Sequence, residues 1–293
     1  MSVAQYFSEF MAAITISADK RGTISYRTAR ITGQLNADYW ASTSDTAHRF
    51  YGGSYGRNTA IPSVSDVDLM YVLPYAVYER FHAYASGGQS ALLQEVKRSV
   101  ERTYPNSAVI ADGQIIGIAF IDGITFEIVP VFLNKDGSYT HACSNNGGSW
   151  RVCKPKHEID EFAGRDSQCN RNLVDVSRMV RAWRDCNNVP MSGMLIDTLA
   201  YQFIANWYHR DKSYLYFDFL TRDFFNFLAN QSTTQNYWLA PGSGSYVWRT
   251  GAFEYKARQA ELRALAAIRH IEASEHWSAR QKYREMYGTA FPS

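Results

Sequence analysis

Hydrophobic and polar positions recur along the chain at helical spacing near the N-terminus. Five apolar residues lie three or four positions apart: Val3, Tyr6, Phe7, Phe10 and Met11. This spacing predicts a helix over residues 2–17. A polar turn at residues 18–22 and a longer helix from about residue 25 to residue 47 are expected to follow.

Short apolar runs then predict strands. The run over residues 67–73 predicts a buried strand, and residues 76–103 have a helical pattern broken near Gly87. Three further runs are separated by Asp-Gly pairs, which favour tight hairpins: residues 108–111, 115–120 and 124–132. The N-terminal half is therefore expected to hold a mixed helix-and-sheet lobe with an antiparallel meander.

The second half of the chain has the pattern of a helical lobe. Beyond a Gly/Asn/Ser-rich loop at residues 144–149, four segments have helical periodicity: residues 170–186, 193–210, 222–230 and 252–273. Residues 239–246 predict a mobile connection. These patterns predict an α+β protein of two lobes, residues 1–150 and 151–293, at a length that suits about two domains.

Composition narrows the class of protein. Hydrophobic residues make up 46% and charged residues 20%, which is ordinary globular usage and argues against disorder. No apolar run is long enough for a membrane helix and the start lacks a secretory signal pattern, so a cytoplasmic chain with reduced cysteines is expected. Thirty basic and 28 acidic residues give a net charge of +2. This charge is too small to support a protein that binds long nucleic acid by wrapping it.

Two aspartates at the start of the predicted strand are the first candidates for chemistry. Asp66 and Asp68 are two residues apart, so a strand would project both carboxylates from one face. Like charges this close are tolerated when a divalent cation lies between them. The alternative is a polar strand end whose aspartates face water.

Two neighbouring features favour the metal alternative. Gly53-Ser54 precedes the pair and forms a turn whose N–H groups and hydroxyl can approach a phosphate, with Arg57 as nearby positive charge. Glu127 is a lone acid in an apolar run, where an unpaired carboxylate is costly. If its strand pairs with that of Asp66 and Asp68, three acids can hold two Mg²⁺ ions, for which Mn²⁺ can substitute.

The motif and its order along the chain resemble a known family. Gly53-Ser54, then about a dozen residues, then Asp66-Val67-Asp68-Leu69, resembles the signature of DNA-polymerase-β-like nucleotidyltransferases, with Glu127 as the third acid. Within this superfamily, the residues from Gly53 to Ile61 most resemble those of the bacterial cGAS/DncV-like nucleotidyltransferases, the CD-NTases. This resemblance implies a polymerase-β-like fold with a long N-terminal spine helix, and a helical lobe that closes a nucleotide cleft.

The second half offers further candidates for nucleotide binding. Arg178 and Arg181 lie three residues apart on one helix face, and the resemblance puts Arg181 where the family commonly has a lysine that reaches the donor triphosphate. A solvated basic helix face is the alternative. Ser192 matches a family serine near the nucleotide. Tyr214 is a candidate for stacking on a purine, although most of the surrounding aromatic residues are expected in the helical core.

The resemblance to this family also implies a function. A ribose hydroxyl of one nucleotide would attack the α-phosphate of another NTP, with ATP and GTP as expected substrates, and a second round would close a cyclic oligonucleotide, with a cyclic dinucleotide favoured. The product would activate a separate effector protein in anti-phage (CBASS) signalling, under regulators encoded beside the enzyme. A transferase that makes linear products or modifies RNA or protein, and a catalytically inactive nucleotide sensor, are the alternatives.

Overall fold

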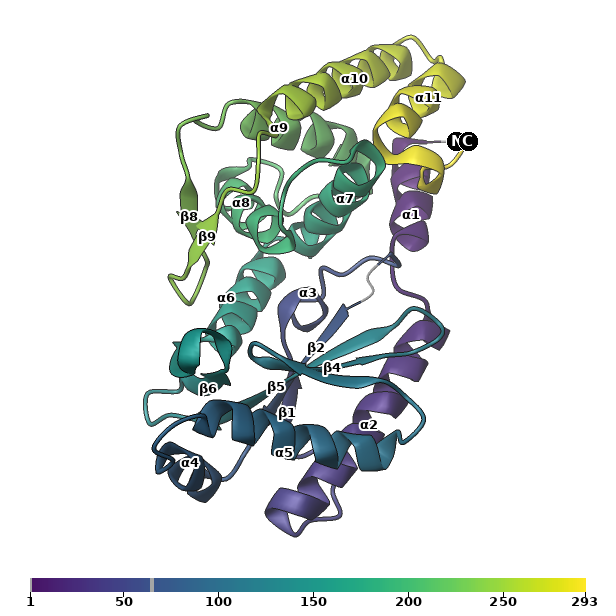
Figure 1. The fold of residues 1–293 in the computed structure, drawn as a ribbon. Helices are drawn as coiled ribbons and strands as arrows, with labels where there is room; N and C mark the ends of the chain where they lie inside the picture. The colour runs from purple at the N-terminus through teal and green to yellow at the C-terminus, as the bar shows by residue number, and fades with distance from the viewer. Residues whose placement is uncertain (1, 64–65) are drawn as a thin grey trace. The chain divides into compact units, whose positions relative to one another are not determined.

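The computed structural model describes residues 2–63 and 66–293, and the chain forms two compact units (Figure 1). The sheet unit comprises Ile16–Gly56 and Ser63–Ile159. The helical unit comprises the N-terminal segment up to Thr15, the short segment Arg57–Pro62, and Asp160–Ser293. Each unit is thus assembled from separate stretches of sequence. The assignment of a catalytic lobe to residues 1–150 and a closing lobe to residues 151–293 stays a prediction.

The sheet unit is built on a mixed seven-stranded sheet. Its strands are β1 (Arg49–Tyr51), β2 (Asp66–Val72), β3 (Val109–Asp112), β4 (Ile115–Ala119), β5 (Thr125–Leu133), β6 (Tyr139–Cys143) and β7 (Ser149–Cys153). The order is β1-β2-β5-β4-β3, while β6 pairs with β5 and with β7. Strands β2 and β5 run parallel and every other pair is antiparallel. The expected mixed sheet and meander are confirmed, and β1, β6 and β7 were not predicted.

Alternation along β2 separates two environments. Val67, Leu69 and Tyr71 are buried in one core, where they pack with apolar residues of the long helices α2 (Ala18–Trp40) and α5 (Gly88–Thr103). Met70 instead belongs to a smaller apolar cluster with residues of β5 and β6. Asp66 and Asp68 therefore share the face of Met70. A short helix, α4 (Tyr75–His82), precedes α5, as the break near Gly87 predicted.

The long helix differs from its predicted bounds. The prediction of a polar turn at residues 18–22 is wrong, because the Ser17 side chain accepts a hydrogen bond from Lys20 N (3.2 Å) and caps α2 at Ala18. The helix ends before Ala41, which adopts a left-handed conformation (φ 48°). Buried Asn36 then holds the departing chain, since its Nδ2 donates to Ser44 O (2.7 Å).

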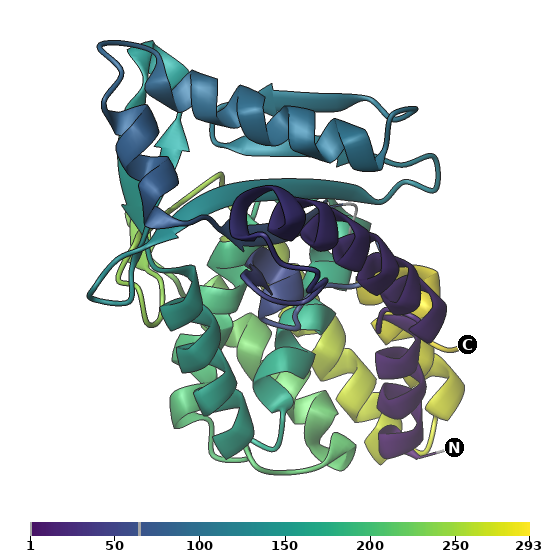
Figure 2. The same ribbon diagram turned by 90° about the horizontal axis from the view of Figure 1, so that it is seen from below.

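The helical unit gathers helices from both ends of the chain. They are α1 (Val3–Ala13), α7 (Asn172–Asn187), α8 (Gly193–Asn206), α9 (Phe217–Ala229), α10 (Glu254–Glu272) and α11 (His276–Tyr287). Helix α6 (Pro155–Gln168) runs from the sheet unit into the helical unit. Figures 1 and 2 show α1 beside α11, and Phe7 packs edge-on against Tyr283 with ring centroids 5.1 Å apart. The helices of the second half agree with the sequence pattern within a few residues, but α6 and α11 were not predicted.

A small hairpin contains residues 239–246, where the sequence predicts a mobile connection. Strands β8 (Tyr237–Leu239) and β9 (Tyr246–Trp248) pair antiparallel across a Gly/Ser-rich turn. Trp238 and Val247 are buried in the helical core, and this contact fixes the hairpin against its unit. The two strands were not predicted because three residues give too short a pattern to detect, and the mobility of the turn between them stays a prediction.

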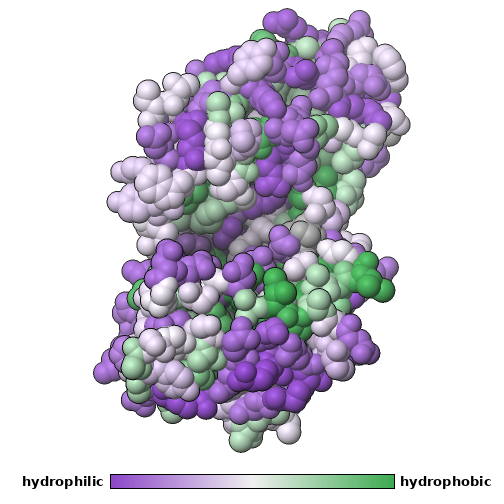
Figure 3. All heavy atoms as spheres, viewed as in Figure 1, coloured by the Kyte–Doolittle hydropathy of each residue, from purple (hydrophilic) through white to green (hydrophobic). Residues whose placement is uncertain are grey.

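Hydrophilic residues cover most of the molecular face shown in Figure 3, with smaller hydrophobic areas among them. Among the described residues, no helix combines the length and the apolar composition that a membrane span needs.

Candidate active site

Three carboxylates share one face of the central strands of the sheet unit. The parallel register of β2 and β5 places Asp68 opposite Glu127 and Asp66 opposite Thr125. Because side chains alternate along a strand, Asp66, Asp68 and Glu127 project from the same face. The intervening Val67 and Phe126 are buried on the other face. The structure thus brings together the acids that the sequence singled out.

The acids interact electrostatically. Burial raises the pKa of the Glu127 carboxyl above its ordinary value, and the negative charges of Asp68 and then Asp66 raise it further. Glu127 is half-buried, so its charged form loses part of its hydration and faces like charge at once. Such repulsion within an apolar sheet is expected where a cation or a proton is to be held.

This repulsion predicts a stability change. A carboxyl whose pKa is raised on folding contributes stability that is fully present below its unfolded pKa, about 4.3 for glutamate, and that is lost as the pH rises through the folded pKa. At neutral pH in metal-free buffer, Glu127→Gln should therefore be more stable than the wild type. Denaturant unfolding at pH 4 and pH 7.5 measures this, and an advantage that is not larger at pH 7.5 would contradict it.

The Gly53-Ser54 turn packs directly against Asp68. Gly53 opens the short helix α3 (Gly53–Gly56) with a φ of +52°, and a Cβ at this position would lie 1.8 Å from Asp68 Oδ2. Gly52 N donates to Asp68 O (2.9 Å). Only glycine admits both this backbone conformation and this approach. Gly53 and Ser54, the predicted phosphate-binding residues, thus belong to a turn that contacts a predicted catalytic acid.

The predicted magnesium site is consistent with the donor chemistry but is not assembled as a cage. Oxygen donors on one face suit Mg²⁺, which keeps several waters and needs few protein ligands. Within residues 2–63 and 66–293, however, no group of three or more His, Cys, Asp or Glu side chains is arranged to hold a metal ion. Ligation by Asp66, Asp68 and Glu127 together stays a prediction.

Two of the predicted phosphate-binding arginines are buried against an aspartate. Arg181 donates from Nη1 and Nη2 to the Asp197 carboxylate (both 2.9 Å), and Arg57 Nε donates to the same carboxylate (2.9 Å). Asp197 is fully buried, and the two guanidinium side chains are at most 5% exposed. Burial lowers the pKa of Arg181, an effect that the Asp197 charge opposes. Phosphate binding by Arg57 and Arg181 stays a prediction, and in this structure both bind Asp197.

Arg178 lies on the same helix as Arg181, and its guanidinium group binds Asn58. Its Nε donates to Asn58 O (3.0 Å) and its Nη2 to Asn58 Oδ1 (2.8 Å). Its Nη1 also contacts Thr15 Oγ1 (3.3 Å). The bidentate contact fixes Asn58, whose φ of 60° is left-handed. Its role as a phosphate ligand likewise stays a prediction.

The remaining predicted residues also have structural contacts. Ser192 is the N-cap of α8, where its side chain accepts from Leu195 N (3.1 Å). The Tyr214 ring packs edge-on against Phe217 at 4.7 Å, and its hydroxyl is hydrogen-bonded to Asp175. Burial raises the pKa of Asp175 to about 6. Nucleotide contacts by Ser192 and Tyr214 stay predictions.

Sequence reasoning missed Asp197, although a signal was present. Asp197 is a lone acid in the apolar stretch Met194–Ala200, which is the same pattern that drew attention to Glu127. Applied there, the rule that a buried carboxylate needs a cationic partner would have led to a search for arginines, but not to Arg57, 140 residues away.

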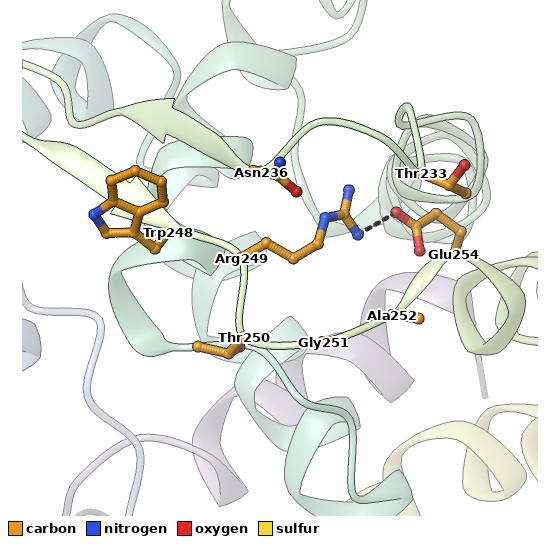
Figure 4. A pocket seen from close by; sticks show the side chains of 8 residues that line it. All are labelled: Thr233, Asn236, Trp248, Arg249, Thr250, Gly251, Ala252 and Glu254. Carbon is orange, nitrogen blue, oxygen red and sulfur yellow. Dashed lines mark hydrogen bonds and ion pairs between the residues drawn. The ribbon is translucent and has the colours of Figure 1, made fainter.

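A separate pocket of about 520 Å³ opens in the helical unit (Figure 4). Its lining is Thr233, Asn236, Trp248, Arg249, Thr250, Gly251, Ala252 and Glu254. Arg249 and Glu254 form an ion pair at 2.6 Å inside it. None of these residues is a predicted site residue.

Comparisons with solved structures show the same fold in bacterial enzymes. CdnC of E. coli MS115-1, solved in complex with HORMA-deltaN, is 14% identical with a TM-score of 0.70, over 99% of this chain and 98% of that chain. The GTP-bound form of Vibrio cholerae DncV is 14% identical with a TM-score of 0.69, over 100% and 96%. The CdnE cyclic dinucleotide synthase of Elizabethkingia meningoseptica is 17% identical with a TM-score of 0.51, over 77% and 83%.

The family assignment comes from the sequence match rather than from these distant structures. No curated protein sequence matches the chain. The family model of the Second Messenger Oligonucleotide or Dinucleotide Synthetase domain matches residues 1–166, which is more than half of the chain. That range contains Gly53, both aspartates and Glu127. The chain therefore belongs to the second messenger oligonucleotide or dinucleotide synthetase family, and it is a nucleotidyltransferase.

Proposed function

We propose that this chain joins nucleoside triphosphates into a cyclic oligonucleotide, with a cyclic dinucleotide as the product, by Mg²⁺-dependent nucleotidyl transfer. The observation that carries the proposal is the β2–β5 register, which sets Asp68 opposite Glu127 and next to the Gly53 turn. The family to which the chain belongs supports an oligonucleotide or dinucleotide product, and the similar fold of a cyclic dinucleotide synthase supports its closure into a ring.

The chain's own residues have distinct roles in this reaction. Asp66 and Asp68 would hold two Mg²⁺ ions and Glu127 one of them. When bound, the ions would supply positive charge that lowers the pKa of the attacking ribose hydroxyl and neutralises the triphosphate. N–H groups of the Gly53-Ser54 turn bind phosphate oxygens. The hydroxyl oxygen bonds to the α-phosphorus, the bond to the β-phosphate oxygen breaks, and pyrophosphate leaves. In this proposal Glu127 also helps to accept the hydroxyl proton.

The substrates and the setting belong to the same proposal. Solved relatives include CdnC with ATP and DncV with GTP, which supports ATP and GTP as substrates here. CdnC was also solved with a HORMA protein, which supports control of this chain by a protein regulator. We propose that the product activates a separate effector in anti-phage (CBASS) signalling in the cytoplasm, where NTPs are abundant.

Product analysis tests the proposal. The purified chain is incubated with all four labelled NTPs and Mg²⁺ or Mn²⁺, and products are identified by mass spectrometry before and after phosphatase treatment. A phosphatase-resistant cyclic product is expected, because a closed ring has no terminal phosphate. A phosphatase-sensitive product would indicate a linear or polymer-modifying transferase. NTP binding without pyrophosphate release would favour the sensor.

A further inference from the structure

The carboxylate of Asp197 is the centre of a buried charge cluster in the helical unit. It accepts hydrogen bonds from Arg57 Nε (2.9 Å), from both Nη atoms of Arg181 (2.9 Å each) and from Thr59 Oγ1 (3.0 Å). Asp197 and Thr59 are 0% exposed. A buried carboxylate is tolerated only with such complete pairing. The cluster therefore has one well-determined geometry.

The cluster fixes a short segment of chain, Arg57–Pro62. Arg57 and Thr59 bind Asp197 on α8, and Asn58 binds Arg178 on α7 through both its backbone and its side-chain oxygen. Ile61 is buried in the helical core. These contacts explain why the segment belongs to the helical unit, whereas the chain on either side of it belongs to the sheet unit.

The position of this segment in the sequence gives it a role in the reaction. It begins directly after α3, whose first residue packs against Asp68, and it ends four residues before Asp66. Its conformation therefore sets how the chain leaves helix α3, which carries the phosphate-binding turn. Displacement of reacting groups by about 1 Å can cost about 10²-fold in rate.

We infer that Asp197 and Asn58 are positioning residues for nucleotidyl transfer, which hold Arg57–Pro62 in the one conformation that the carboxylates of β2 require. The inference rests on the proposed role of Asp66, Asp68 and Glu127. In this arrangement Arg57 and Arg181 bind Asp197, and Arg178 binds Asn58. The positioning role needs no direct contact between these arginines and phosphate.

The separate effects of a substitution on kcat and on KM distinguish a positioning role from phosphate binding. If Arg57 and Arg181 served only to bind triphosphate, removing the negative charge of Asp197 would strengthen their attraction for phosphate and lower KM while kcat held. If Asp197 positions the segment, Asp197→Asn lowers kcat by about 10²-fold with little change in KM. Pyrophosphate release at varied NTP concentration measures both constants. A lowered KM with unchanged kcat would overturn the inference.

Asn58 supplies a test that does not disturb the core, because its side chain is exposed. Asn58→Gly accepts the left-handed backbone but loses the side-chain acceptor for Arg178, and kcat should fall about tenfold, as for one lost charge-assisted hydrogen bond. Asn58→Asp keeps an acceptor oxygen and should restore most of kcat. Equal kcat in the wild type and Asn58→Gly would overturn the inference even if Asp197→Asn failed to fold.

The control separates positioning from a general loss of stability. Glu254→Gln breaks the Arg249–Glu254 ion pair, which lines the pocket of the helical unit (Figure 4) and is not one of the contacts described above that hold Arg57–Pro62. It should lower the melting temperature while kcat of the folded protein holds. If Glu254→Gln and Asn58→Gly lost kcat equally, Asn58 would have a structural role only. If Asp68→Asn leaves activity intact, the proposed function itself fails. If only Asp197→Asn and Asn58→Gly stay active, the positioning role fails and the proposed function stands.

Discussion

Asp68→Asn should lower the turnover of nucleotidyl transfer by about 10³-fold, at the upper end of what loss of one charge-stabilising group costs. Asp68 lies opposite Glu127 in the parallel register and in contact with the Gly53 turn, so it is the acid that connects the other parts of the site. The amide preserves the shape of the side chain and removes its negative charge. Pyrophosphate release at saturating NTP and Mg²⁺ measures the loss.

Stability distinguishes this loss from unfolding. The charge of Asp68 raises the pKa of Glu127, so removing it relieves repulsion and the variant should melt no lower than the wild type in metal-free buffer. Asp122→Asn is the matched control, because Asp122 lies on the β4–β5 connection of the same unit and pairs with Arg27 at the surface (2.8 Å). It should keep full activity. More than a tenth of wild-type turnover in Asp68→Asn would contradict the proposed role.

Gly53→Ala should lower turnover by about 10²-fold, through geometry rather than through charge. The new methyl would lie 1.8 Å from Asp68 Oδ2 and 2.7 Å from its Cγ, distances that no carbon atom tolerates. Either the carboxylate rotates away or the turn moves. The left-handed backbone adds a cost of about 1–2 kcal/mol for any residue with a Cβ.

The paired measurements are turnover and the free energy of unfolding. Gly22→Ala is the control, because Gly22 lies inside α2 and an added Cβ would meet no atom within 4 Å beyond the adjacent residues and backbone of its own helix. That variant should gain about 0.5–1 kcal/mol of stability and keep its activity. If Gly53→Ala kept both stability and turnover, the close packing of the turn on Asp68 would have no functional meaning.

Local patterns allowed the sheet side of the site to be predicted. Asp66 and Asp68 fall on one face because the strand period is two, and Glu127 stands out because its neighbours are apolar. What the sequence left open was the register. A shift of β5 by one residue would turn Glu127 to the other face, and only the packed sheet shows that it lies opposite Asp68.

In the helical unit, local patterns did not predict the contacts of the candidate residues. The three-residue spacing of Arg178 and Arg181 predicted a shared, solvated or phosphate-binding face, yet Arg181 is almost fully buried. Its partner Asp197 lies on another helix, and nothing in the spacing along the chain encodes that meeting. Helix α11 was missed for a related reason: its buried stripe of Ala279, Tyr283 and Met286 is narrow and interrupted by charged residues.

The path of the backbone limits how this enzyme can be taken apart. The chain passes from one unit to the other after Thr15, Gly56, Pro62 and Ile159, so no single cut separates them. A fragment starting at residue 160 would lack α1 and the buried Ile61, and would expose the aromatic surface around Phe7 and Tyr283. We expect such a fragment to aggregate, and recombination between homologous genes to yield folded chimaeras only when all four crossings come from one parent.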